Sequence, residues 1–181
     1  MKARRCIPKD IEVEVTNITL LTIEEVCALP PDIRRYRGWW WLRSPGCTSA
    51  CAVVCCAVGV VDYYGYEVDY FNGTVRPALT LSNLDSEPLE IGEEILIAGK
   101  NYIAIGKDRL LYNDKMVLHR FDKESNEYEK SEIKKIVDKW LNRKEELSQE
   151  AKQSKNLNLL WLDIPRLLRE GRQYLWQSKP F

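Results

Sequence analysis

The stretch WWWLRSPG at residues 39–46 decides which fold this sequence adopts. Aromatic residues favour an extended strand, and Pro45-Gly46 then ends that strand with a turn. Alternate residues of a strand face opposite sides, so Trp39 and Trp41 share one face and Trp40 takes the other. At least one of these faces must be core. We therefore predict a strand packed inside a sheet, in preference to a stacking platform for sugars or bases.

Downstream of this strand, short strand-like runs predict an antiparallel meander over residues 39–81. Small and β-branched residues at 52–58 predict a buried strand, and residues 66–71 and 75–81 predict two more. Asn72-Gly73 stands between the last two runs, and this dipeptide is a strong hairpin signal.

Upstream, alternating apolar residues predict one or two strands within the first 20 residues. A short helix at about 23–29 follows. Its start is marked by Thr22, whose side chain caps the first turn, and by Glu25, which reaches back to the Thr22 amide. Pro30-Pro31 ends this helix.

After the tryptophan-containing half, the polar stretch 82–92 predicts a linker. Two hairpins and two helices follow it. We expect one hairpin from strands at 94–98 and 102–106 and the other from strands at 110–112 and 116–121. The helices are expected at 131–153 and 164–177. These patterns predict an α+β protein with residues 1–81 as one half and 82–181 as the other.

Composition narrows the classes of function. The 181 residues are 45% hydrophobic and carry 27 basic and 27 acidic side chains, so the net charge is zero. Without a block of like charge, direct binding to nucleic acid is not expected. The longest apolar stretch, Ala50–Val61, is too short to span a bilayer, and no secretory signal follows the N-terminus. We expect a cytoplasmic protein with no membrane contact.

The cysteines and the single histidine do not predict a metal-binding or catalytic site. The cysteines are Cys6, Cys27, Cys47, Cys51, Cys55 and Cys56. Their spacing lacks paired zinc knuckles, and adjacent strand residues point to opposite faces, so we predict reduced thiols and no metal. His119 is interpreted as a strand histidine on the polar face of a hairpin. No nucleotide-binding or metalloprotease motif is present, so we predict neither a cofactor nor an enzyme.

The segment between Cys47 and Asn72 is rich in tyrosine and small polar residues. Rigid amphipathic rings provide contact area at low entropic cost, which is typical of an adaptable binding surface. A half-buried, tyrosine-rich strand pair is the alternative interpretation. The candidate partner-binding residues are Tyr63, Tyr64, Tyr66, Asp69, Tyr70 and Asn72.

Three segments carry a family resemblance: LLTIEEV at 20–26, WWLRSPG at 40–46 and VRPAL at 75–79. Over about residues 18–81 the chain resembles the bacterial and phage family catalogued as domain of unknown function 6273, which is similar to C-type-lectin-like and formylglycine-enzyme-like folds. The resemblance implies that Arg43 and Arg76 are structural and buried in hydrogen-bond networks. The expected structural signature is Trp41, Arg43, Arg76 and Pro77.

Residues 91–142 resemble the usual first half of the same family. The two halves would then stand in reversed order, as in a permuted domain, and one intertwined domain and two domains both remain open.

The function that follows is non-catalytic binding. Our first hypothesis is a phage-encoded protein in the host cytoplasm that blocks a host protein or protein–nucleic acid complex, as an anti-CRISPR inhibitor does. The alternative is a hypervariable lectin-fold module of a phage that binds a receptor or ligand, since lectin-like proteins display variable side chains on this scaffold. A third is an enzyme of the formylglycine-generating fold, although its copper-binding cysteine pair has no clear counterpart here.

Overall fold

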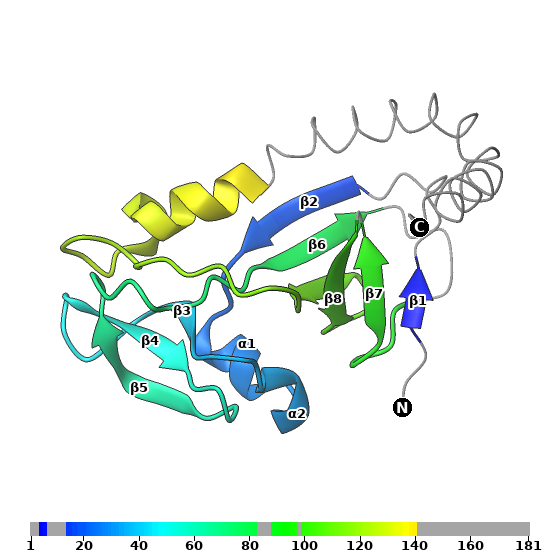
Figure 1. Ribbon diagram of the computed structural model, residues 1–181, viewed down its shortest axis with the longest axis horizontal. Helices are drawn as coiled ribbons and strands as arrows, with labels where there is room; N and C mark the ends of the chain where they lie inside the picture. Colours follow the sequence, from blue (N-terminus) through cyan, green and yellow to red (C-terminus); the bar gives the residue numbers. More distant parts are fainter. Residues whose placement is uncertain (1–3, 7–13, 83–87, 98, 141–181) are drawn as a thin grey trace, which may run out of the picture. The chain divides into compact units, whose positions relative to one another are not determined.

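The computed structural model describes residues 4–6, 14–82, 88–97 and 99–140 (Figure 1). Of the two compact units Met1–Asn142 and Arg143–Phe181, only the first contains described residues. Its strands are β1 (Arg4–Cys6), β2 (Glu14–Thr19), β3 (Trp40–Pro45), β4 (Cys51–Cys55), β5 (Val61–Glu67), β6 (Ala78–Ser82), β7 (Glu94–Ile97), β8 (Lys100–Ala104) and β9 (Arg109–Tyr112). Its helices are α1 (Ile23–Cys27), α2 (Pro31–Arg34), the 3-10 helix η1 (Tyr128–Lys130) and a helical segment at 132–140.

The strands form two sheets. The larger sheet has the order β1-β7-β8-β9-β6-β2, and the smaller has the order β3-β4-β5. All neighbouring pairs are antiparallel except β1 and β7. The larger sheet thus takes strands from both sides of residue 82. The α+β class predicted from the sequence is confirmed.

The start of α1 follows the local sequence signal. The Thr22 hydroxyl accepts a hydrogen bond from the Glu25 amide at 3.2 Å, and the Glu25 carboxylate accepts one from the Thr22 amide at 2.8 Å. This confirms the predicted capping box. The helix ends at Cys27, two residues earlier than predicted. The second short helix, α2, was not predicted, because Pro31 had been interpreted only as a stop, although proline also suits the first turn of a helix.

The small sheet, β3-β4-β5, forms only the first part of the meander predicted over residues 39–81, and its strands are displaced along the chain. The strand predicted at 75–81 corresponds to β6, which belongs to the larger sheet. β4 ends at Cys55, so the prediction of a buried strand through Val58 is wrong at that end, and Val58 is 67% exposed. Gly59 adopts a left-handed conformation with φ of 87°, and the chain turns there into β5. β5 lies at residues 61–67, so the strand predicted at 66–71 is also misplaced.

The hairpin predicted at Asn72-Gly73 is wrong. Residues 71–72 do turn, but the strands on either side, β5 and β6, belong to different sheets. Packing explains the glycine, because a Cβ atom at Gly73 would lie 1.9 Å from the Trp41 indole nitrogen. The glycine permits close approach to an aromatic core and does not mark a two-residue hairpin turn.

In the second half of the chain, the first hairpin is confirmed as β7 and β8, and β9 is confirmed at the start of the second. The strand predicted at 116–121 is wrong. This segment crosses towards the small sheet and makes one isolated bridge through Leu118. Residues 132–140 are helical, as expected, whereas residues 141–153 and the helix predicted at 164–177 lie outside the described residues. Of the predicted linker, Ser82 ends β6, and Leu89 is buried.

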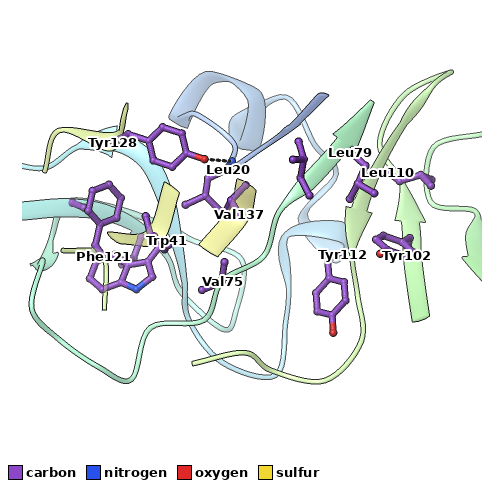
Figure 2. Close-up of a cluster of buried hydrophobic side chains, with 14 of the residues drawn as sticks. Leu20, Trp41, Val75, Leu79, Tyr102, Leu110, Tyr112, Phe121, Tyr128 and Val137 are labelled. Atoms are coloured by element: carbon purple, nitrogen blue, oxygen red, sulfur yellow. Dashed lines mark hydrogen bonds between the residues drawn. The ribbon is translucent and has the colours of Figure 1, made fainter. Parts of the chain in front are cut away.

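The core has two clusters, and they meet opposite faces of β3 and β4. One cluster contains Trp41, Ala52 and Val54, and the other contains Trp40 and Cys55. Figure 2 shows the first cluster, where the Tyr128 hydroxyl contacts the Leu20 amide. Trp40 and Trp41 are fully buried, so the predicted core role of the tryptophan strand is confirmed.

Arg76 is fully buried, and its side chain lies between the end of α2 and the end of β9. Its guanidinium donates to the carbonyl oxygens of Tyr112 at 2.9 Å and Ile33 at 3.1 Å, to that of Arg34 at 3.4 Å, and to the Asn113 side chain at 3.2 Å. The rings of two aromatic residues lie against it, Tyr36 at 4.6 Å and Trp40 at 5.0 Å. Burial lowers the pKa of Arg76 to about 10, so it remains charged at neutral pH.

The other two signature positions, Pro77 and Arg43, differ in burial. Pro77 is buried beside Arg76. Arg43 is half-exposed and pairs with Glu25 at 3.5 Å, so the buried network that the resemblance implies is present at Arg76 and not at Arg43.

Replacing Arg76 with methionine leaves several buried acceptors without donors. We expect the free energy of unfolding to fall by about 3–5 kcal/mol, because each unsatisfied buried group costs about 1–3 kcal/mol. Urea unfolding followed by circular dichroism measures this loss. The matched variant Arg43→Met should lose no more than about 1 kcal/mol, as for an exposed ion pair. Equal losses in the two variants would contradict the assignment.

The buried thiol of Cys55 should make the folded protein less stable as pH rises above about 9. Burial raises its pKa to about 11, so the folded protein holds this proton more tightly than the unfolded chain does. The resulting contribution is complete below about pH 9 and is lost as pH rises towards 11. The stability difference between wild type and Cys55→Ala should therefore shrink by on the order of 2 kcal/mol between pH 8 and pH 11. Urea unfolding of both proteins across this pH range measures the change.

Candidate interaction surface

The predicted partner-binding residues are mostly exposed, but they do not lie together. Tyr63, Tyr64 and Tyr70 are 59%, 76% and 51% exposed. Asp69 and Asn72 are exposed, and Tyr66 is half-buried. Their positions follow from the irregular pairing of β4 with β5.

A bulge in β5 breaks the alternation that the sequence suggests. Ala52 pairs with Tyr66 and Val54 pairs with Asp62, so residues 63–65 together oppose Val53. Gly65 has φ of 77°, and a Cβ atom there would lie 2.2 Å from the Ala52 carbonyl oxygen. The bulge therefore requires glycine.

The side chain of Asp62 closes this bulge. Its Oδ1 atom accepts hydrogen bonds from the amides of Tyr64 at 3.1 Å and Gly65 at 3.4 Å. The backbone amides of the bulge thus have a nearby hydrogen-bond acceptor in the Asp62 side chain.

Tyr63 and Tyr66 consequently meet different neighbours. The Tyr63 hydroxyl lies 3.6 Å from the Cys27 thiol at the end of α1. Tyr66 instead packs against Trp39, with ring centroids 4.7 Å apart. The six candidates therefore fall into at least two groups on the surface.

The aromatic patch is here defined as three rings in mutual contact, Trp39, Tyr66 and Tyr70, together with the exposed Phe71 that follows Tyr70 in the chain. The Tyr70 ring lies 6.3 Å from those of both Trp39 and Tyr66. Trp39 is also in edge contact with the buried Trp41 at 4.9 Å. Trp39 therefore links the patch to the core, and the rings of Trp39, Tyr66 and Tyr70 pack on one another.

Phe71 adds an ionic component at the border of the patch. The ring is 62% exposed, and the Arg120 guanidinium lies 4.9 Å from its centroid. Glu132 holds this guanidinium with two hydrogen bonds, of 2.5 and 3.0 Å. Hydrogen bonding to Arg120 lowers the pKa of the Glu132 carboxyl, and the same bonds raise the pKa of Arg120. The sequence did not point to Arg120, because its partners are distant along the chain.

His119 lies in a loop and not on the predicted strand, and its Nδ1 atom is 2.7 Å from the Arg120 carbonyl oxygen. Within the described part of the chain, no group of three His, Cys, Asp or Glu side chains could hold a metal ion. Nor is any helix of that part long and apolar enough to cross a membrane.

The thiols differ in accessibility. Cys27 and Cys47 are exposed, Cys51 and Cys56 are half-buried, and Cys55 is buried. All five are free cysteines.

A polar cavity of about 580 Å³ lies elsewhere on the same unit. Its charged groups pair with each other: Glu25 with Arg43 and with Arg109 at 3.0 Å, and Lys134 with Asp138 at 2.5 Å. Glu129 also lines the cavity, so three acidic and three basic side chains balance, and the cavity presents no excess of either sign to a ligand.

Comparison with known proteins finds no matching family model, no similar curated protein and no similar solved structure.

Tyr66 packs in the aromatic patch and Tyr64 lies in the bulge, so their removal should lower the free energy of unfolding by different amounts. Tyr66→Ala should lower the free energy of unfolding by about 2 kcal/mol, because a half-buried ring packed on Trp39 is lost. Tyr64→Ala should change it by less than about 0.5 kcal/mol, since Tyr64 is mainly exposed. Thermal unfolding of both variants measures the difference. A greater loss in Tyr64→Ala would overturn the assignment of the two rings.

Proposed function

We propose that this protein is a non-catalytic binding protein and that the aromatic patch contacts a protein partner. The observation that carries the proposal is the exposure of Tyr70 and Phe71, at 51% and 62%. The Tyr70 ring packs on Trp39 and Tyr66, and the Phe71 ring packs on the Arg120 guanidinium. Large rings that are already ordered lose little entropy on binding, and tyrosine and tryptophan dominate the energetics of protein interfaces.

The charges beside the patch favour a protein over a nucleic acid. Surfaces that stack single-stranded bases combine aromatic rings with a positively charged groove for the phosphates. Here the cation Arg120 is paired with Glu132, and the exposed carboxylate of Asp69 stands next to Tyr70. A phosphate backbone would meet repulsion from Asp69.

For the finer fold, we propose a lectin-like core of the domain of unknown function 6273 family. Burial of the signature residues Trp41, Arg76 and Pro77 supports this proposal. So does the arrangement of the meander beside two short helices.

For the biological role, we propose that the protein blocks a macromolecule of the host cell, as an anti-defence inhibitor does. The exposed rings of the aromatic patch support this role, since they are available to occupy a partner's surface.

Affinity capture with matched variants tests the proposal. Immobilised wild-type protein and a Tyr70→Ala/Phe71→Ala variant are exposed to the same bacterial lysate, and retained proteins are compared by mass spectrometry. We expect a protein retained by wild type at ten times or more the amount retained by the variant, because an anchoring ring contributes about 2 kcal/mol to binding. Tyr63→Ala is the control, since Tyr63 contacts α1 and not the patch.

Both variants must first show wild-type melting temperatures. A protein retained equally by wild type and by the patch variant, and lost in Tyr63→Ala, would place the contact surface beside α1 and contradict the proposal.

A further inference from the structure

One ring at the border of the aromatic patch already holds a guanidinium. The face of Phe71 lies 4.9 Å from the guanidinium carbon of Arg120, and Glu132 fixes the guanidinium through Nε and Nη2. A ring face and a carboxylate acting together are a favourable environment for arginine, because the flat cation stacks on the ring while its edge donates to the oxygens.

Tyr70 and Asp69 offer the same two chemical groups beside this arrangement. The Tyr70 ring is half-exposed and touches only Trp39 and Tyr66 among the rings of the described residues. The Asp69 carboxylate is exposed and makes no ion pair within the described part of the chain, although its charge acts on Arg120. Here, a ring and a carboxylate are exposed, and the nearby cation, Arg120, is held by Glu132 and not by Asp69.

The charges around the pair favour an incoming cation. Asp69, Asp122 and Glu132 are carboxylates in this region, whereas Arg120 and Lys123 are the cations beside them. Arg120 and Lys123 both pair with Glu132, at 2.5 and 3.8 Å. Three carboxylates and two cations leave one negative charge in excess, and neither cation pairs with Asp69.

We propose that Tyr70 and Asp69 receive an arginine side chain of the protein partner, with the guanidinium over the Tyr70 ring and its edge on the Asp69 carboxylate. This inference rests on the proposed function and specifies the partner's chemistry. Arginine suits the pair better than lysine, because its planar guanidinium stacks on a ring and donates to both oxygens of a carboxylate, whereas an ammonium does neither.

Capped peptides test the chemistry without a known partner. The full chain, labelled with ¹⁵N, is titrated at about 150 mM salt, near the physiological ionic strength, with acetylated and amidated hexa-arginine, hexa-lysine and single-stranded oligothymidylate. Chemical shifts of the Tyr70 amide and the Trp39 indole report on binding. We expect hexa-arginine to bind with a Kd at least threefold below that of hexa-lysine, and the oligothymidylate to leave both signals unchanged.

Matched variants assign the contact to the proposed pair. Asp69→Asn and Tyr70→Leu should each weaken hexa-arginine binding about two- to fivefold, in line with an exposed cation–ring contact. The control Asp108→Asn removes an equal charge from an exposed turn before β9 and should leave the Kd unchanged.

The outcomes separate this inference from the proposed function. Equal binding of hexa-arginine and hexa-lysine, or equal effects of Asp69→Asn and Asp108→Asn, would overturn the arginine assignment. If the patch variant still loses its captured protein, the binding function stands without it. Shifts caused by the oligothymidylate and abolished by Tyr70→Leu would overturn both, in favour of a nucleic-acid ligand.

Discussion

The buried guanidinium of Arg76 is the interaction on which the arrangement of the two sheets depends. Its donors reach Ile33 and Arg34 at the end of α2, and Tyr112 and Asn113 at the end of β9. One side chain thereby joins the helices beside the small sheet to the large sheet. No carboxylate pairs with this cation among the described residues, so carbonyl dipoles and the flanking rings must compensate for its desolvation. Such a charge tolerates only the geometry that satisfies all of its donors.

The tryptophan strand β3 connects the core around Arg76 to the surface. Trp40 packs on the guanidinium in one core cluster, and Trp41 packs on Phe121 in the other. Trp39 continues from Trp41 to the surface, where Tyr66 and Tyr70 lean on it. The aromatic patch is exposed, but it packs on the core through the contact of Trp39 with the buried Trp41. Rings that are ordered before contact retain more of their interaction energy for the partner.

Local signals in the sequence predicted local structure well. The capping box of Thr22 and Glu25, the alternation of the tryptophan strand, and the hairpin of β7 and β8 depend on residues a few positions apart. The mixed α+β class follows from these elements. The exposure of several tyrosines agrees with a contact surface, whereas Tyr66 is half-buried as the alternative interpretation expected.

The sequence by itself determined the periodicities, the helix start and the residue types of the aromatic segment, because each depends on short-range geometry. Only the tertiary structure decided which strands pair and which rings meet. Gly73 is a glycine because Trp41 fills the space beside it, and Gly65 because the Ala52 carbonyl does. The first was read as a hairpin turn, and the bulge at the second sets Tyr63 apart from Tyr66. Arg120 reaches Phe71 from a segment about fifty positions away, and no spacing along the chain encodes that contact.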